Sequence, residues 1–258
     1  MQTRIAAALT RLEADHDIRI LYACESGSRA WGFPSPDSDY DVRFIYLRRP
    51  GWYLTLDDGP DTLNFPVDEE LDLAGWDLRK ALKLLRSSNA ALFEWLQSPA
   101  VYYAAPEFLP AVQPLLAGTF NLRAGLHHYL GLVRRGLETD LTGEAVRLKR
   151  LFYALRSALA ARWIRTRHAL PPIEFTRLRE LLPAALSPEV DELLERKAQA
   201  TEKTTVPRPA ALVEFLEQEY AACQAARDTL PVPTGSDPTP ELNKVFQQLL
   251  AGSFPLPL

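Results

Sequence analysis

The sequence predicts an α+β protein in which a small mixed β-sheet in the N-terminal part is followed by an all-helical C-terminal half. Two β-rich runs, at residues 18–23 and 40–47, are separated by turn signals in the first part. After Pro106 the apolar residues recur at helical spacing, and we find no convincing strand pattern. We therefore expect a sheet domain over residues 1–105, a helical domain over 106–230, and a Pro-rich linker with a C-terminal helix over 231–258.

Several further elements follow from local patterns. Residues 3–16 form an amphipathic helix, residues 52–56 are a strand candidate, and residues 68–73 alternate as in a strand. From Gly75 onward the pattern becomes helical, and Asn89 is expected to cap a short helix that ends at Leu96. The later helices are expected at residues 107–117, 119–137, 141–168, 188–200, 209–229 and 242–250.

Composition limits the class of protein. Hydrophobic residues make up 47% of the 258 positions, which is enough for a core, and the net charge of −4 gives no general attraction to nucleic acid. The charges are unevenly distributed, with fourteen acids and seven arginines in residues 1–75 but ten Lys or Arg and three acids in residues 121–168. Such a division suits a metal–triphosphate complex, which carries both signs.

Neither the N-terminal sequence nor the cysteine content points to secretion or to a membrane. The N-terminal residues lack a signal-peptide pattern, and no run approaches eighteen apolar residues. Cys24 lies in an apolar strand and Cys223 is distant from it in sequence, so we expect buried, reduced thiols. We expect a cytoplasmic protein with no membrane contact.

Asp39 and Asp41 are the first candidate site residues. They lie two residues apart at the start of a predicted strand, so both side chains should point to one face while Tyr40, Val42 and Phe44 point to the other. Two carboxylates on one face repel unless a cation lies between them. Mg²⁺ is the expected cation, because it takes oxygen ligands from one or two carboxylates together with substrate phosphate.

A Gly27-Ser28 turn precedes this pair. Glycine lets backbone N–H groups approach an anion closely, and a serine hydroxyl adds a donor. Arg29 is a candidate phosphate clamp, although an exposed helix arginine explains it equally well. No Walker sequence occurs. A phosphate-binding turn beside a carboxylate metal site is typical of enzymes that catalyse phosphoryl or nucleotidyl transfer.

A second candidate set lies in the helix expected at residues 141–168. Lys149, Tyr153 and Arg156 recur at i, i+4 and i+7 and form a stripe beside the buried face of that helix. Two cations with an aromatic residue between them suit triphosphate contact and base stacking. A solvated flank of the helix explains the same pattern, and the sequence leaves both interpretations open.

The motif then extends to a family resemblance. The spacing of Gly-Ser, ten residues and Asp-x-Asp resembles the signature of the DNA polymerase β-like nucleotidyltransferase superfamily. The fuller string, G-S-R-A-x-G followed by S-D-x-D, resembles its bacterial minimal branches. Residues 21–46, with the later segment 75–80, resemble one family of predicted bacterial nucleotidyltransferases, some of them associated with RNA ligases.

This resemblance implies a third carboxylate on a neighbouring strand and a two-metal Mg²⁺ site. Asp72 is our choice for that residue, with Glu70 as the fallback. The resemblance also implies that Gly27 and Ser28 hold the phosphates of a nucleoside triphosphate, and that the helical half holds nucleotide and acceptor. The expected reaction moves a nucleoside monophosphate to an acceptor hydroxyl, with an RNA end first. A protein side chain or small molecule is the alternative acceptor, and a non-catalytic nucleotide-binding module is the third possibility.

Overall fold

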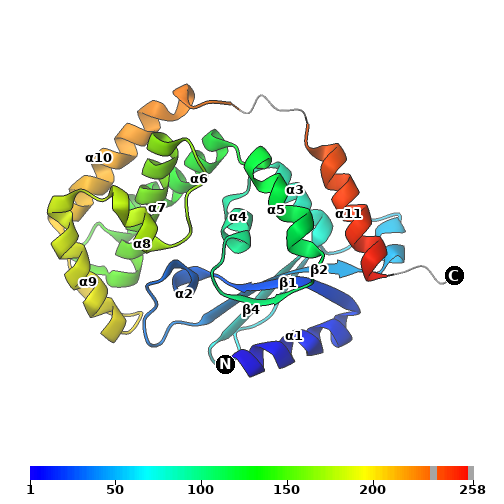
Figure 1. Cartoon of the computed structure of the whole chain (residues 1–258). Helices are drawn as coiled ribbons and strands as arrows, with labels where there is room; N and C mark the ends of the chain where they lie inside the picture. The colour runs from blue at the N-terminus through cyan, green and yellow to red at the C-terminus, as the bar shows by residue number, and fades with distance from the viewer. Residues whose placement is uncertain (233–236, 255–258) are drawn as a thin grey trace. The chain divides into compact units, whose positions relative to one another are not determined.

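The computed structural model describes residues 1–232 and 237–254, which fall into two compact units. The first unit comprises residues 1–27, 39–119 and the described residues from 237 onward. The second comprises residues 28–38 and 120–232. Both contain helices, and the first contains the main sheet, so the predicted α+β class is confirmed (Figure 1).

The first unit is built on a five-stranded mixed sheet in the order β3-β4-β2-β1-β5. Its strands are β1 (Ile18–Glu25), β2 (Tyr40–Arg48), β3 (Thr62–Asn64), β4 (Leu71–Asp77) and β5 (Val101–Ala104). Strands β2 and β4 are parallel, whereas the other pairs are antiparallel. The parallel pair matters most for the site, because it aligns the N-terminal ends of two strands that carry acids.

Helix α1 (Gln2–His16) covers one face of this sheet (Figure 1). Its buried residues Ile5, Leu9 and Leu12 pack in one core with Val42, Phe44 and Tyr46 of β2. The predicted alternation of β2 is therefore confirmed, with these aromatic and branched side chains on the core face. Because side chains alternate along a strand, Asp41 and Arg43 lie on the other face of β2.

Four helices complete the first unit: α3 (Leu78–Arg86), α4 (Ala90–Leu96), α5 (Phe108–Thr119) and α11 (Thr239–Ser253). Asp77 caps α3 by accepting a hydrogen bond from Arg79 N at 2.8 Å, and Asn89 caps α4 as predicted. Trp95 of α4 stacks on Trp76 of β4 with ring centroids 3.8 Å apart. These contacts fix the helices that follow β4.

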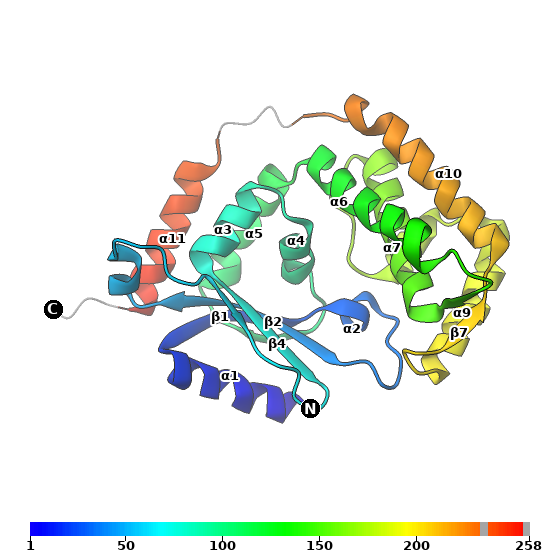
Figure 2. The same ribbon diagram turned by 180° about the vertical axis from the view of Figure 1, so that it is seen from behind.

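The second unit is a helical cluster around α6 (Leu122–Arg135), α7 (Leu148–Arg167) and α10 (Ala210–Ala226), with α2 (Gly27–Trp31), α8 (Phe175–Leu178) and α9 (Ser187–Gln199) (Figure 2). The predicted buried face of α7 is confirmed. Its members are Leu148, Leu151, Phe152, Leu155 and Leu159. A two-stranded sheet, β6 (Ala145–Arg147) with β7 (Thr205–Pro207), was not expected in this helical half.

Three local predictions are wrong. Residues 52–56 do not form a strand, because Pro50 opens a 3-10 helix over Pro50–Leu54 and the apolar Leu54 remains 85% exposed. Residues 68–70 form a turn in which Glu69 has a φ of 54°, so β4 begins only at Leu71. That strand then runs to Asp77, past the Gly75 at which we expected helix. Strands β3 and β5 were missed because each is only three or four residues long.

The remaining predictions concern the cysteines, the linker and the membrane. Cys24 and Cys223 are buried and unpaired, and burial raises the pKa of the Cys24 thiol to about 12. The predicted linker at 231–240 lies partly outside the described residues. Among the helices that the structure describes, none is both long and apolar enough to cross a membrane.

Candidate active site

Asp41 and Asp72 lie side by side in the sheet of the first unit. Their strands β2 and β4 are parallel, and the two residues are direct register partners. Because side chains alternate along a strand, partners in a parallel pair point to the same face. Asp39 lies one residue before β2, and Glu70 lies in the turn before β4. The register thus brings Asp72, rather than Glu70, next to Asp41.

Arg43 bridges these two acids, a role that the sequence pattern did not predict. Its Nη2 donates to Asp41 Oδ1 at 2.9 Å and to Asp72 Oδ2 at 2.7 Å. The side chains of Arg43, Asp41 and Asp72 are only 18%, 27% and 28% exposed, respectively. Arg43 follows Asp41 by two residues and therefore shares its face. Its guanidinium supplies the positive charge that two adjacent carboxylates need.

The backbone conformation and surroundings of residue 27 explain why a glycine occupies this turn. The φ of Gly27 is +62°, which favours glycine, and a Cβ built on it would lie 2.1 Å from Asp41 Oδ2. Any side chain here would therefore displace the Asp41 carboxylate. The neighbouring Ser26 N–H donates to Asp41 O at 2.8 Å, which ties the turn to β2.

Glu25 supports the same strand from inside the protein. It is 1% exposed, and its Oε1 accepts a hydrogen bond from Asp41 N at 2.8 Å. The hydroxyl of Tyr102 donates to its other carboxylate oxygen. Glu25 therefore positions the backbone of Asp41. A single acid at the end of a strand has no distinctive spacing, so the sequence offers no signal for this role.

Of the predicted metal ligands Asp39, Asp41 and Asp72, the structure places Asp41 and Asp72 side by side. Among the described residues, no group of three or more His, Cys, Asp or Glu side chains is close enough to hold a metal ion. Asp41 and Asp72 do share one cationic atom, and both supply the hard oxygen ligands that Mg²⁺ takes. The carboxylate of Asp41 itself fills the space that the missing side chain of Gly27 leaves. Asp41 and Asp72 are donors of the type that the predicted metal takes, and Arg43 supplies the cation between them.

The predicted phosphate-binding residue Ser28 belongs to the second unit, in a buried hydroxyl network. Its Oγ donates to Ser38 Oγ at 3.2 Å, and that hydroxyl contacts Glu202 Oε1 at 3.2 Å. Lys149 Nζ contacts both carboxylate oxygens of Glu202 at 2.7 Å. Arg29 Nη2 donates to Ser38 O at 2.7 Å. The structure therefore joins three predicted residues, Ser28, Arg29 and Lys149, through Ser38 and Glu202.

Trp31 contacts the other two residues predicted to bind nucleotide, Tyr153 and Arg156. The ring of Tyr153 meets Trp31 edge-on with centroids 4.9 Å apart, and Arg156 Cζ lies 4.2 Å from the Trp31 ring centroid. Arg156 is 2% exposed and donates to Ile173 O at 3.3 Å. The stripe on α7 is thus a packed wall beneath residues 28–38 and not a solvated flank.

A cavity of about 580 Å³ lies beside this wall, between residues 29–36 and α9. Arg29 and Lys197 are among its lining residues, and Lys197 Nζ donates to Ser35 Oγ at 2.8 Å. Burial lowers the pKa of the Lys197 ammonium. The volume is within the range of small-molecule sites, so this unit offers space for a ligand next to Arg29.

Residues 1–248 match the family described as "RlaP: RNA repair pathway DNA polymerase beta family". The chain belongs to this family. The expected relationship to polymerase β-like nucleotidyltransferases is thereby confirmed, and the RNA repair description agrees with the RNA-ligase association that the sequence implied.

Two known proteins are similar to this RlaP-family chain. The uncharacterized protein YcgL of Bacillus subtilis (strain 168) is 40% identical over 248 residues, which cover 95% of each chain. A crystal structure of a nucleotidyltransferase-like protein from Exiguobacterium sibiricum 255-15 aligns with 98% of this chain and 82% of that one, at 11% identity and a TM-score of 0.31. That structural likeness is too weak to argue from.

Proposed function

We propose that this protein transfers a nucleoside monophosphate from a nucleoside triphosphate to the terminal hydroxyl of an RNA. The observation that carries the proposal is the pairing of Asp41 with Asp72 on adjacent parallel strands, beside a glycine whose missing side chain makes room for the Asp41 carboxylate. The chain belongs to a DNA polymerase β family whose description names an RNA repair pathway, which supports both nucleotidyl transfer and an RNA acceptor.

In this proposal Asp39, Asp41 and Asp72 hold Mg²⁺. When bound, the metal ions would lower the pKa of the acceptor hydroxyl and stabilise the leaving pyrophosphate. Arg43 keeps Asp41 and Asp72 adjacent before substrate arrives, and Glu25 fixes the backbone from which Asp41 projects. These contacts hold the acids in place, which limits the reorganisation required at the moment of reaction.

The nucleotide is assigned to the turn and to the wall beneath residues 28–38. Gly27 and Ser28 would bind the phosphates through backbone N–H groups and the Ser28 hydroxyl. We assign Arg29 to phosphate contact beside its cavity and Lys149 and Tyr153 to nucleotide binding, while the buried Arg156 supports this wall through Trp31. Because Lys149 reaches Ser28 through Glu202 and Ser38, part of its effect would be to orient that hydroxyl.

The transfer itself is a single displacement at the α-phosphorus. The bond between the acceptor oxygen and phosphorus forms as the bond to pyrophosphate breaks. Pyrophosphate carries away the electron pair of the broken bond, and the hydroxyl proton passes to Asp72, the acid on the neighbouring strand. No covalent enzyme intermediate is required.

Incubation with each α-phosphate-labelled nucleoside triphosphate and Mg²⁺, with and without RNA, tests the proposal. We expect label on RNA, and a yield that falls steeply with salt because RNA contacts release counterions. Label on the protein, or on a small acceptor with little salt dependence, would contradict the RNA assignment. Label on neither would contradict the reaction itself.

A further inference from the structure

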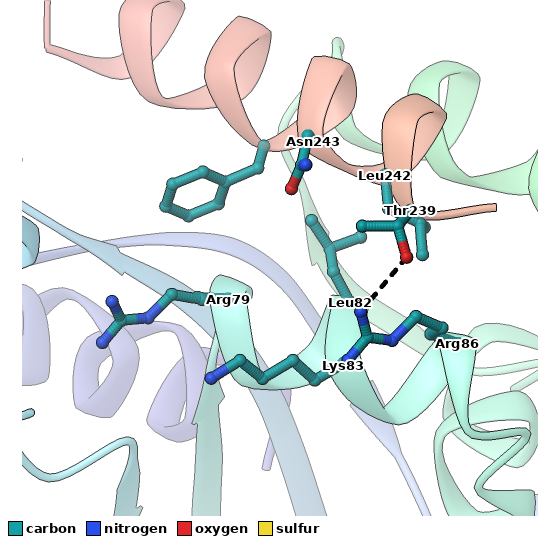
Figure 3. A pocket seen from close by; sticks show the side chains of 8 residues that line it. Arg79, Leu82, Lys83, Arg86, Thr239, Leu242 and Asn243 are labelled. Carbon is teal, nitrogen blue, oxygen red and sulfur yellow. Dashed lines mark hydrogen bonds between the residues drawn. The ribbon is translucent and has the colours of Figure 1, made fainter. Parts of the chain in front are cut away.

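A groove between α3 and α11 in the first unit is not used by the proposed reaction. Its volume is about 240 Å³. Arg79, Lys83 and Arg86 line it from α3, and Leu242, Asn243 and Phe246 line it from α11 (Figure 3). The groove thus combines a cationic wall with a wall that is apolar and amide-bearing.

The cationic wall is a single helical face. Arg79, Lys83 and Arg86 are spaced i, i+4 and i+7, so they extend along roughly 10 Å of α3. Arg79 Nη2 contacts Asp58 Oδ1 at 2.9 Å, but that acid is 81% exposed, and Arg86 Nη1 donates to Thr239 Oγ1 at 3.1 Å. For the exposed Lys83 ammonium, no described residue forms a hydrogen bond or ion pair.

The facing side of α11 carries no carboxylate among the described residues that line the groove. Glu241 points elsewhere and accepts from Lys244 Nζ at 2.8 Å. Asp237, before the helix, has its pKa lowered first by hydrogen bonds from Thr239 and only last by Arg86. The side chain of Asn243 is exposed and lies across the groove from the cations (Figure 3).

One aromatic residue, Phe246, is among the described residues that line the groove, and it packs on further aromatic side chains. Phe246 meets Tyr53 edge-on with centroids 5.1 Å apart, and Arg79 Cζ lies 5.4 Å from the Tyr53 centroid and 5.5 Å from that of Trp52. The Tyr53 hydroxyl donates to Asp77 Oδ2 at 2.6 Å, which fixes the ring. Cations beside an ordered aromatic surface are the combination that binds single-stranded nucleic acid, because phosphates meet the charges and bases meet the rings.

The groove is also distant from the candidate catalytic acids. Asp72 is the second residue of β4 and Asp77 the last, so five residue steps of extended strand separate them, roughly 17 Å. A ligand in the groove therefore does not occupy the triphosphate position beside Asp41 and Asp72.

We infer that the α3–α11 groove binds the RNA acceptor, with a phosphate on Arg79, Lys83 and Arg86 and a base against Asn243 and Phe246. This inference rests on the proposed function for the identity of the strand. The chemistry required is that of a phosphorylated nucleoside, which a free mononucleotide shares.

The test is fluorescence anisotropy of a labelled single-stranded oligoribonucleotide of about ten nucleotides, a typical single-strand site length. Lys83→Ala should raise its Kd about tenfold and reduce the salt slope by about 0.7, the value for one phosphate contact. Lys244→Ala, which removes the same charge from another face of α11, is the matched control and should change neither quantity.

A second pair of variants probes the opposite wall. Asn243→Asp adds a negative charge inside the groove with almost no change of shape and should weaken RNA binding about tenfold or more. Gln248→Glu adds the same charge on an exposed face outside the groove and should leave Kd within about twofold. Melting temperatures confirm that each variant is folded.

The outcomes separate this inference from the proposed function. Equal RNA affinity for Lys83→Ala, Asn243→Asp and wild type would overturn the groove as an RNA site, even if nucleotidyl transfer proceeds. Binding of adenosine monophosphate that Asn243→Asp weakens, with no binding of the oligonucleotide, would also overturn it in favour of a mononucleotide site. Loss of RNA binding in both groove variants, in a protein that transfers no label, would support the groove and contradict only the reaction.

Discussion

Gly27 lies directly against the carboxylate of Asp41, so that a Cβ on Gly27 would stand 2.1 Å from Asp41 Oδ2. The glycine of the Gly-Ser turn therefore has a specific steric task, beyond the flexibility of its backbone. The Asp41 carboxylate occupies the position that a side chain at residue 27 would take.

Replacing this glycine tests that relationship. Gly27→Ala should abolish nucleotide transfer, because the new methyl group displaces Asp41, and should cost about 1–2 kcal/mol of stability for the positive φ. Gly32→Ala is the matched control, since Gly32 also has a positive φ, but a Cβ added there would meet no other atom within 4 Å. It should lose similar stability and keep its activity. Equal activity in the two variants would rule out the steric role.

Arg43 should stabilise the acids in the absence of metal. Arg43→Met keeps much of the length of the side chain but leaves Asp41 and Asp72 without their shared cation. We expect it to lose about 1 kcal/mol in EDTA, a fall in Tm of about 2–4 °C, and to recover more stability with Mg²⁺ than wild type does. Thermal melts with EDTA and with Mg²⁺ measure both effects. An identical Mg²⁺ response in variant and wild type would contradict this role.

The third acid can be identified by two conservative changes. Asp72→Asn should remove catalysis and spare much of the nucleotide affinity, because Asp72 is the register partner of Asp41. Glu70→Gln should behave as wild type, because Glu70 lies in the turn before β4. Rates of label transfer and nucleotide titrations decide the matter. An inactive Glu70 variant beside an active Asp72 variant would show that the assignment is wrong.

Lys149 and Arg156 should differ in their effects. Lys149→Ala should raise the nucleotide Kd about tenfold, as expected when a charge-assisted contact is lost, while Arg150→Ala, one residue along α7, should leave it unchanged. Arg156→Ala should instead lower the unfolding free energy by about 2 kcal/mol, because its buried guanidinium packs on Trp31. Nucleotide titrations and thermal melts separate the two. Unchanged affinity in the Lys149 variant would confine the nucleotide to the sheet.

Much of the fold could be predicted from the sequence, because long elements carry strong periodic patterns. The alternation of Val42, Phe44 and Tyr46 and the apolar stripe of α7 both identified buried faces correctly. Short strands such as β3 and β6 were missed, since three residues are too few to establish a period. Residues 52–56 were misassigned because Pro50 opens a 3-10 helix over Pro50–Leu54, which leaves Leu54 and Leu56 exposed instead of in a strand.

The residues of the candidate site could likewise be predicted only in part from the sequence. The spacing of Gly27, Asp39 and Asp41 identified the motif, and the register places Asp72 beside it. Arg43, Glu25 and Glu202 could not be found in this way, because each acts through a partner distant in sequence or by burial alone. Pairing across a sheet or between loops leaves no fixed spacing along the chain.

The proposed function depends on Asp39 and Asp41, the carboxylates at the start of β2, supporting nucleotidyl transfer. The most direct measurement is transfer of α-phosphate label to RNA by wild type, Asp39→Asn and Asp41→Asn, with and without Mg²⁺. We expect Mg²⁺-dependent labelling of RNA by wild type alone, while both variants remain folded with a Tm within a few degrees of wild type. Full labelling by either variant, or a large fall in Tm with activity retained, would contradict it.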